Sequence, residues 1–190
     1  MIELRNLTKR YGRIVAVNRL NLSVPRGELF GFIGPNGAGK TTTIRIIGGL
    51  LAPTEGTVII DGIDMAREPE RAKKRIGLIP DRPFLYEKLT GMEFMRFIAD
   101  FYDVDHRNLD ENARRLLAMF GLEGRSHELI ESYSHGMKQR LIMSAALLHE
   151  PPLIVVDEPM VGLDPQGIKM VRDLFREMAQ SGATIFMSTH

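Results

Sequence analysis

A glycine-rich segment near the N-terminus constrains the fold of this chain more than any other feature. From Gly34 to Thr41 it has a glycine, four residues and then Gly-Lys-Thr. The apolar run 29–33 before it predicts a strand, and the stretch after Gly39 predicts a helix. Glycines suit such a turn because its backbone N–H groups point inward, where side chains would block an anion. The segment therefore predicts a strand, an anion-binding loop and a helix.

The donors of this loop match those that a polyphosphate requires. The helix that follows adds its unpaired N–H groups and the positive end of its dipole. Lys40 would reach the β- and γ-phosphates, the Thr41 hydroxyl would ligate Mg²⁺, and Thr42 would offer a further donor. The predicted ligand is Mg-ATP, and the residues predicted to bind it are Gly34, Pro35, Asn36, Gly37, Ala38, Gly39, Lys40, Thr41 and Thr42. The alternative is a strand-to-helix turn without a ligand, which would have this spacing by chance.

The rest of the chain alternates short apolar runs with amphipathic helical stretches, which predicts an α/β fold with a mostly parallel sheet flanked by helices. The expected strands are 2–7, 15–24, 28–33, 57–60, 76–79, 153–156 and 184–188. The expected helices are 39–49, 91–102, 109–120, 136–149 and 165–182, the last with Asp164 as N-cap and Pro165 at its first position. Residues 84–149 predict a helical lobe inserted in one domain that spans 1–190.

Composition excludes several classes of function. The 25 Lys and Arg residues against 24 Asp and Glu leave a net charge of +1, so no strong field would hold nucleic acid or an anionic membrane nonspecifically. The absence of cysteine excludes disulfides, thiolate metal sites and a cysteine nucleophile, and is compatible with a reducing cytosol. The longest nearly apolar stretch, 141–148, is far too short to span a membrane. The sequence predicts a soluble chain that can dock on a membrane partner.

An acidic pair, Asp157 and Glu158, follows the apolar run 153–156. Such a run is typical of a central parallel strand whose carboxyl end opens on a ligand crevice. Asp157 would hold the magnesium shell, and Glu158 would orient and deprotonate the water that attacks the γ-phosphate. The alternative is that the two acids only cap a helix.

A second helix start lies at 133–140, where Ser134 is placed as an N-cap and Gly136 follows it. A capped helix start with a nearby glycine is another anion site. One chain rarely needs two phosphate-binding helix ends for one nucleotide. Ser134 and Gly136 are therefore predicted to contact the nucleotide of a partner copy.

Together these motifs resemble the ATP-binding subunits of ABC transporters over essentially the whole chain. Residues 34–42 resemble the Walker A loop, 153–158 the Walker B strand with its catalytic glutamate, 162–164 the D-loop and 133–137 the signature. Tyr11 stands where the family's aromatic stacks on adenine, although it could be an ordinary loop aromatic. His190 stands where the family has its switch histidine.

The resemblance implies a P-loop NTPase fold with an N-terminal antiparallel β portion. It also implies that two copies pair head to tail around ATP and Mg²⁺ and hydrolyse ATP. This would drive a separate integral membrane subunit, with the chain held on the cytoplasmic, inner face of the cell membrane and no nucleic acid as partner. The amino-acid sequence of the stretch 84–101 is most similar to that of exporter-type subunits.

The chain departs from the family pattern at three places. In the signature, Tyr133, His135 and Met137 replace the commoner residues. Asp81 stands where the family has a glutamine; it could meet Mg²⁺ or the attacking water, or it could be only a turn residue. Family members continue beyond the position of His190, so the chain resembles a truncated one.

Two other functions remain open from the sequence. A soluble ABC-type ATPase that acts on nucleic acid or the ribosome would usually carry a second cassette, an insertion or basic extensions. A module that binds nucleotide without hydrolysing it is disfavoured by Glu158. The leading prediction is an ATP-hydrolysing subunit that powers a membrane exporter.

Overall fold

The structure, a computed structural model, describes residues 1–81, 84–160 and 162–189, which belong to two compact units. The first, here called the sheet unit, comprises 1–81, 152–159 and the chain from 170 onward. The second, here called the helical unit, comprises 82–151 and 160–169. The helical lobe predicted over 84–149 falls within the helical unit.

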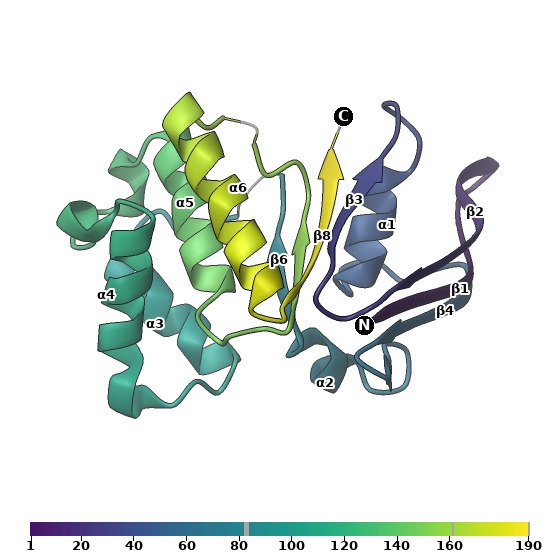
Figure 1. The fold of residues 1–190 in the computed structure, drawn as a ribbon, viewed down its shortest axis with the longest axis horizontal. Helices are drawn as coiled ribbons and strands as arrows, with labels where there is room; N and C mark the ends of the chain where they lie inside the picture. The colour runs from purple at the N-terminus through teal and green to yellow at the C-terminus, as the bar shows by residue number, and fades with distance from the viewer. Residues whose placement is uncertain (82–83, 161, 190) are drawn as a thin grey trace. The chain divides into compact units, whose positions relative to one another are not determined.

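Two sheets make up most of the sheet unit (Figure 1). One is antiparallel, in the order β2-β1-β4-β5, and the other is parallel, in the order β3-β8-β7-β6. The strands are β1 (Ile2–Tyr11), β2 (Ile14–Val24), β3 (Leu29–Ile33), β4 (Glu55–Ile60), β5 (Ile63–Asp64), β6 (Ile76–Ile79), β7 (Leu153–Val156) and β8 (Thr184–Thr189). The parallel sheet and the antiparallel N-terminal portion are confirmed.

Helix α1 (Lys40–Ile47) lies between the two sheets in Figure 1. Its residues Ile44, Ile46 and Ile47 are buried in one core with residues of both sheets and of the short helix α2 (Pro69–Lys73). Strand β7 is buried along its whole length, as its uninterrupted apolar sequence predicts for a central parallel strand. Because α1 is packed on both sides, the loop that precedes it is held by a rigid element.

Among the described residues, three α-helices lie wholly in the helical unit: α3 (Gly91–Phe101), α4 (Leu109–Met119) and α5 (His135–Ala146). They pack against one another, and Figure 1 shows them in teal and green. Helix α3 begins with a capping box, in which the Thr90 hydroxyl accepts from the Glu93 N–H and the Glu93 carboxylate accepts from the Thr90 N–H. Helix α6 (Pro165–Gln180) begins in the helical unit and continues into the sheet unit.

Strand β1 runs to Tyr11, beyond the predicted end at residue 7, and two short elements were not predicted. β5 has two residues and α2 has five, and neither is long enough to show a hydrophobic period. The predicted N-cap of α6 is confirmed, because the Asp164 carboxylate accepts from the Gly167 N–H at 2.8 Å.

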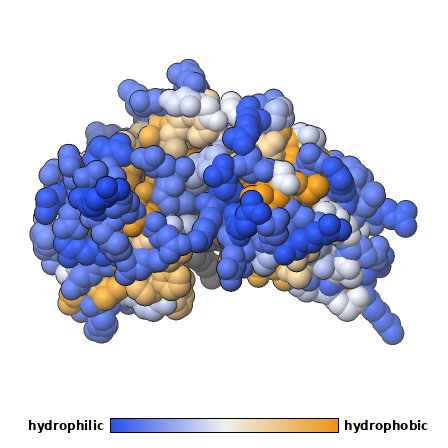
Figure 2. Space-filling view, turned by 90° about the horizontal axis from the view of Figure 1, so that it is seen from below, coloured by the Kyte–Doolittle hydropathy of each residue, from blue (hydrophilic) through white to orange (hydrophobic). Residues whose placement is uncertain are grey.

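Polar residues cover most of the face seen in Figure 2, with apolar residues in separate patches. No helix within the described residues is long and apolar enough to cross a bilayer.

Candidate functional site

The phosphate loop predicted from the sequence connects β3 to α1, as expected. Gly37 and Gly39 have φ angles of 82° and 86°, in the left-handed region that glycine adopts without strain. The Ala38 N–H donates to the Pro35 carbonyl at 3.2 Å, which closes a turn within the loop. Gly39 is the N-cap of α1, and no side chain of a described residue caps this helix start. The N–H groups of the first turn are therefore not used by a side-chain cap.

Lys40 turns back over the loop that precedes it. Its ammonium donates to the carbonyl oxygens of Gly34 and Pro35, the latter at 3.1 Å, and only 7% of the residue is exposed. These bonds hold a positive charge over the loop. Burying an ammonium without hydrogen-bond partners costs free energy, so the loop carbonyls stabilise Lys40 in this position.

The position of Gly39 is fixed by strand β2. A Cβ on Gly39 would lie 2.3 Å from the Ala16 carbonyl oxygen and 3.2 Å from Val17. The first of these neighbours is backbone and has little freedom to move. Glycine is therefore required here both for its φ angle and for its close approach to β2.

The acidic pair lies at the carboxyl end of β7, as predicted. Asp157 is buried, and its N–H donates to the Ile79 carbonyl at 2.9 Å. The Ser188 hydroxyl of β8 donates to Asp157 Oδ1 at 2.6 Å and accepts from the Glu158 N–H at 3.1 Å. One buried hydroxyl thus holds both acids. Ser188 carries no mark of this role in the sequence, because only the parallel pairing of β7 with β8 brings it to Asp157.

Glu158 has a φ angle of 51°, in the left-handed region that a residue with a side chain rarely adopts. Such strain is often found at functional sites, where the surrounding structure maintains it. Here the bond from the Glu158 N–H to Ser188 supports this conformation. Asp81 follows β6, which is parallel to β7, so Asp81 and Asp157 lie at the same edge of the sheet.

The described residues contain no group of three or more His, Asp or Glu side chains that could hold a metal ion by themselves. Mg²⁺ in nucleotide sites is bound by one or two carboxylates together with substrate phosphates, so such a group is not required. Asp157 supplies a buried carboxylate whose second oxygen accepts no hydrogen bond from Ser188, and Thr41 lies in the first turn of α1. These oxygen donors fit Mg²⁺.

Tyr11 ends β1 at the turn into β2, where it pairs with Ile14. Its side chain is 48% exposed, and the Lys9 ammonium lies 5.4 Å from the centre of its ring. Ile14 is also exposed. Strand β2 contacts the phosphate loop through Ala16, which is two residues after Ile14 and five after Tyr11.

The second predicted half-site is the start of α5 in the helical unit. Ser134 is its N-cap, and its hydroxyl accepts from the Met137 N–H at 3.3 Å, which confirms the predicted cap. The ring of His135 lies against Gly162, where an added Cβ would be 2.3 Å from His135 Cδ2. Gly136 also lies close to Gly162, because a Cβ added to Gly136 would be 3.2 Å from the Gly162 carbonyl oxygen. The signature segment and the D-loop segment thus pack together within this unit.

Tyr133, which differs from the commoner residue of the family, has a structural role. It is buried, its hydroxyl donates to the Arg125 carbonyl at 2.7 Å, and burial raises the pKa of that hydroxyl above its usual value. A Cβ added to Gly91 would lie 2.6 Å from this hydroxyl. Tyr133 therefore anchors the segment before Ser134. The predicted site residue His190 lies outside the described residues.

Comparison with known proteins supports this assembly of motifs. Residues 17–161 match the family described as ABC transporter. The chain is 36% identical over its full length to the linearmycin resistance ATP-binding protein of Bacillus subtilis strain 168, and covers 61% of that protein. It is 41% identical to the bacitracin transport ATP-binding protein of Bacillus licheniformis, again over its full length and 61% of the relative. The chain therefore spans about three-fifths of the length of these relatives.

Among solved structures, the chain is similar to a dimeric ATP-binding cassette in a post-hydrolysis state, bound to ADP and Pi. The TM-score is 0.90 at 30% identity, and the match covers all of this chain and 88% of that one. The whole chain therefore has the fold of an ATP-binding cassette, as the sequence predicted.

Proposed function

The chain belongs to the ABC transporter family, and from that premise we propose that it binds and hydrolyses ATP to power a membrane exporter. The observation that carries the proposal is the pairing of two features in the sheet unit. One is a helix start without a side-chain cap, beneath the buried Lys40. The other is the acidic pair held by Ser188 at the end of β7. Together they would provide a phosphate-binding loop and a site for hydrolysis.

The phosphate loop would bind the triphosphate through backbone N–H groups of residues 34–42, apart from Pro35, which has none. Backbone donors and the helix dipole favour an anion at the start of α1. Lys40 would add a charge-assisted hydrogen bond to the β- and γ-phosphates, because its ammonium already lies over the loop. Thr42 would add a hydroxyl donor. Tyr11 would stack on the adenine ring, which its exposure allows.

Hydrolysis would use the acids at the end of β7 and β6. Mg²⁺ would be held by Asp157 and Thr41 and would neutralise charge on the phosphates. Glu158 would accept a proton from the attacking water, and Asp81 would contact this water or the metal shell. Ser188 would hold the Asp157 carboxylate and the Glu158 backbone in place, through its bonds to Asp157 Oδ1 and to the Glu158 N–H. His190 would contact the γ-phosphate in the same reaction.

A second copy would complete the site. Ser134 and Gly136 lie at an exposed helix start and would contact the γ-phosphate held by the phosphate loop of the partner copy. Support comes from the similar cassette, whose structure is described as dimeric with ADP and Pi. Because a hydroxyl donates one hydrogen bond and accepts two, Ser134 can cap α5 and donate to a phosphate at the same time.

A membrane subunit would dock on the helical unit. Four aromatic rings form a continuous row there, with successive ring centres 5.9, 4.9 and 4.9 Å apart: Phe84, Tyr86, Phe97 and Phe101. Phe84 is 80% exposed and Phe101 is 65% exposed. A group of exposed aromatics is typical of a protein interface. The partner would be an exporter's membrane subunit, since the relatives are named for transport of bacitracin and resistance to linearmycin, and this would place the chain at the cytoplasmic face.

The test of hydrolysis replaces Glu158 with Gln. Loss of the general base should slow ATP hydrolysis by about 100-fold or more, while ATP binding persists. The variant should therefore accumulate as an ATP-bound dimer on a sizing column. Glu150→Gln is the matched control, because Glu150 is also a glutamate in the left-handed region, at a φ of 50°. Hydrolysis by Glu158→Gln at the parent rate would show that Glu158 is not the base.

A further inference from the structure

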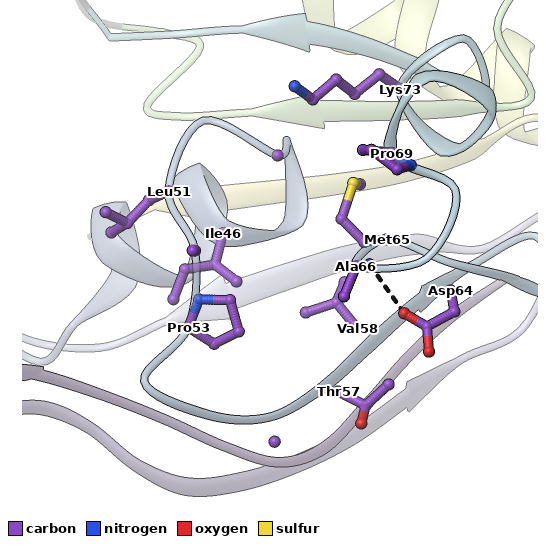
Figure 3. Close-up of a pocket in the computed structure, with 13 residues that line it drawn as sticks. Ile46, Leu51, Pro53, Thr57, Val58, Asp64, Met65, Ala66, Pro69 and Lys73 are labelled. Carbon is purple, nitrogen blue, oxygen red and sulfur yellow. Dashed lines mark hydrogen bonds between the residues drawn. The ribbon is translucent and has the colours of Figure 1, made fainter.

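A pocket of about 210 Å³ lies in the sheet unit, between the end of α1, strand β4 and the segment from β5 to α2 (Figure 3). Its lining residues lie between Ile46 and Lys73, outside the phosphate loop. Most of its walls are carbon, contributed by Ile46, Leu51, Pro53, Val58, Met65 and Pro69. An apolar cavity of about 150 Å³ is large enough to hold benzene, so this pocket has room for a larger ring system.

The walls combine rigid and adaptable parts. Ile46 and Val58 belong to the buried core, so their side chains are held in place. Met65 has a flexible thioether that can adjust to a ligand. Gly49 has a φ of 68°, and a Cβ there would lie 2.7 Å from Lys73 Cε and 3.1 Å from Met65 Sδ. The Lys73 stem and Met65 therefore lie directly on the Gly49 backbone.

The two charged residues of the lining differ in their partners. Asp64 Oδ1 accepts from the Ala66 N–H at 2.8 Å, drawn as a dashed line in Figure 3, and Asp64 Oδ2 pairs with Arg67 Nε at 3.7 Å. Lys73 makes no ion pair with a carboxylate within residues 1–81, 84–160 and 162–189. Figure 3 draws Lys73 and Asp64 on opposite sides of Met65 and Pro69. The Asp64 carboxylate is thus satisfied by its own loop, while the Lys73 ammonium is available for a ligand.

We propose that this pocket binds a small apolar carboxylate, with its ring system among the carbon-lined walls and its carboxylate paired with Lys73. The body of the ligand would gain from leaving water. The packing of the Lys73 stem on Gly49 holds the ammonium at the rim, where it keeps its contact with solvent. A neutral ring system would enter the same pocket but would lack the ion pair.

The test uses 2-naphthoate as the probe and ¹⁵N-labelled chain. Saturable shifts are expected for the backbone amides of residues 49–52 and 64–66, with a dissociation constant of roughly 0.1–1 mM for a ligand of this size. Lys73→Gln should weaken binding by about threefold, the effect of an exposed ion pair. Lys74→Gln is the matched control, because it removes the same charge next to the pocket but from a residue outside its lining. The neutral 2-naphthylmethanol should bind Lys73→Gln and the parent equally.

A second variant, Ala66→Phe, fills the pocket from its wall and should abolish the shifts, with thermal unfolding as a check on the fold. Three results would overturn the proposal. Shifts that cluster on residues 34–42 would show that the carboxylate binds the phosphate loop. Unchanged binding by folded Ala66→Phe would exclude the pocket. Unchanged naphthoate affinity in Lys73→Gln would show that the carboxylate does not pair with Lys73. If Ala66→Phe does not fold, Lys73→Gln alone tests the proposal.

Discussion

The two helix starts that the sequence marks as anion sites are built differently. At α1 in the sheet unit, the N-cap is Gly39, no side chain of a described residue caps the helix, and the buried Lys40 lies over the loop. At α5 in the helical unit, the N-cap is Ser134, and its own hydroxyl accepts from the Met137 N–H. Ser134 and His135 are exposed, and the nearby cation Lys138 is only half-buried and pairs with Glu87.

This difference suggests a division of roles between the two helix starts. A helix start without a side-chain cap offers several N–H groups and a strong site for an anion. A helix start that is capped by its own serine is stable alone and offers fewer donors. The loop before α1 is therefore expected to bind nucleotide by itself, whereas the start of α5 is expected to bind phosphate only when a partner presents it.

The largest expected effect comes from Gly39→Ala. Its φ of 86° and the Ala16 carbonyl at 2.3 Å from the added Cβ should together reduce the free energy of unfolding by about 2–4 kcal/mol. Gly136→Ala at the other helix start should change it by less than about 1 kcal/mol, because alanine favours a helix and the nearest contact is 3.2 Å. Urea unfolding of both variants measures this. Equal losses would show that the two helix starts do not differ in backbone constraint.

The next effect concerns binding. Lys40→Ala should raise the dissociation constant for ATP by about 10- to 100-fold, the contribution of a charge-assisted hydrogen bond. Lys138→Ala is the matched control, because Lys138 lies in the first turns of α5 and pairs with Glu87 at 2.5 Å. Calorimetric titration of the monomer with ATP separates the two. A loss from Lys138→Ala as large as that from Lys40→Ala would contradict the division of roles.

Local sequence was sufficient to predict both helix starts and the acidic pair. Gly39, Ser134 and Asp164 were correctly placed because caps and turns depend on a few neighbouring residues. Strand β7 was correctly placed because burial on both faces gives an uninterrupted apolar run. The catalytic and binding roles of these residues remain predictions until the variants are measured.

What the sequence did not reveal depends on contacts between distant segments. Ser188 holds Asp157 from about thirty residues away, through the pairing of β8 with β7. The burial of Tyr133 depends on Gly91 and on the Arg125 carbonyl. The pocket at Lys73 forms because α1, β4 and the chain around Met65 meet, and no periodicity marks such a meeting.

The smallest effect tests the serine itself. Ser134→Ala removes the cap of α5 and should lower the free energy of unfolding by about 1 kcal/mol. Ser134→Asp should restore stability, because aspartate caps as well as serine, but it should prevent dimer formation with ATP, because its carboxylate would face the γ-phosphate of the partner's nucleotide. Urea unfolding measures stability, and a sizing column in the Glu158→Gln background measures the dimer. If Ser134→Asp were stable and still dimerised with ATP, α5 would be only a capped helix and not the second wall of the nucleotide site.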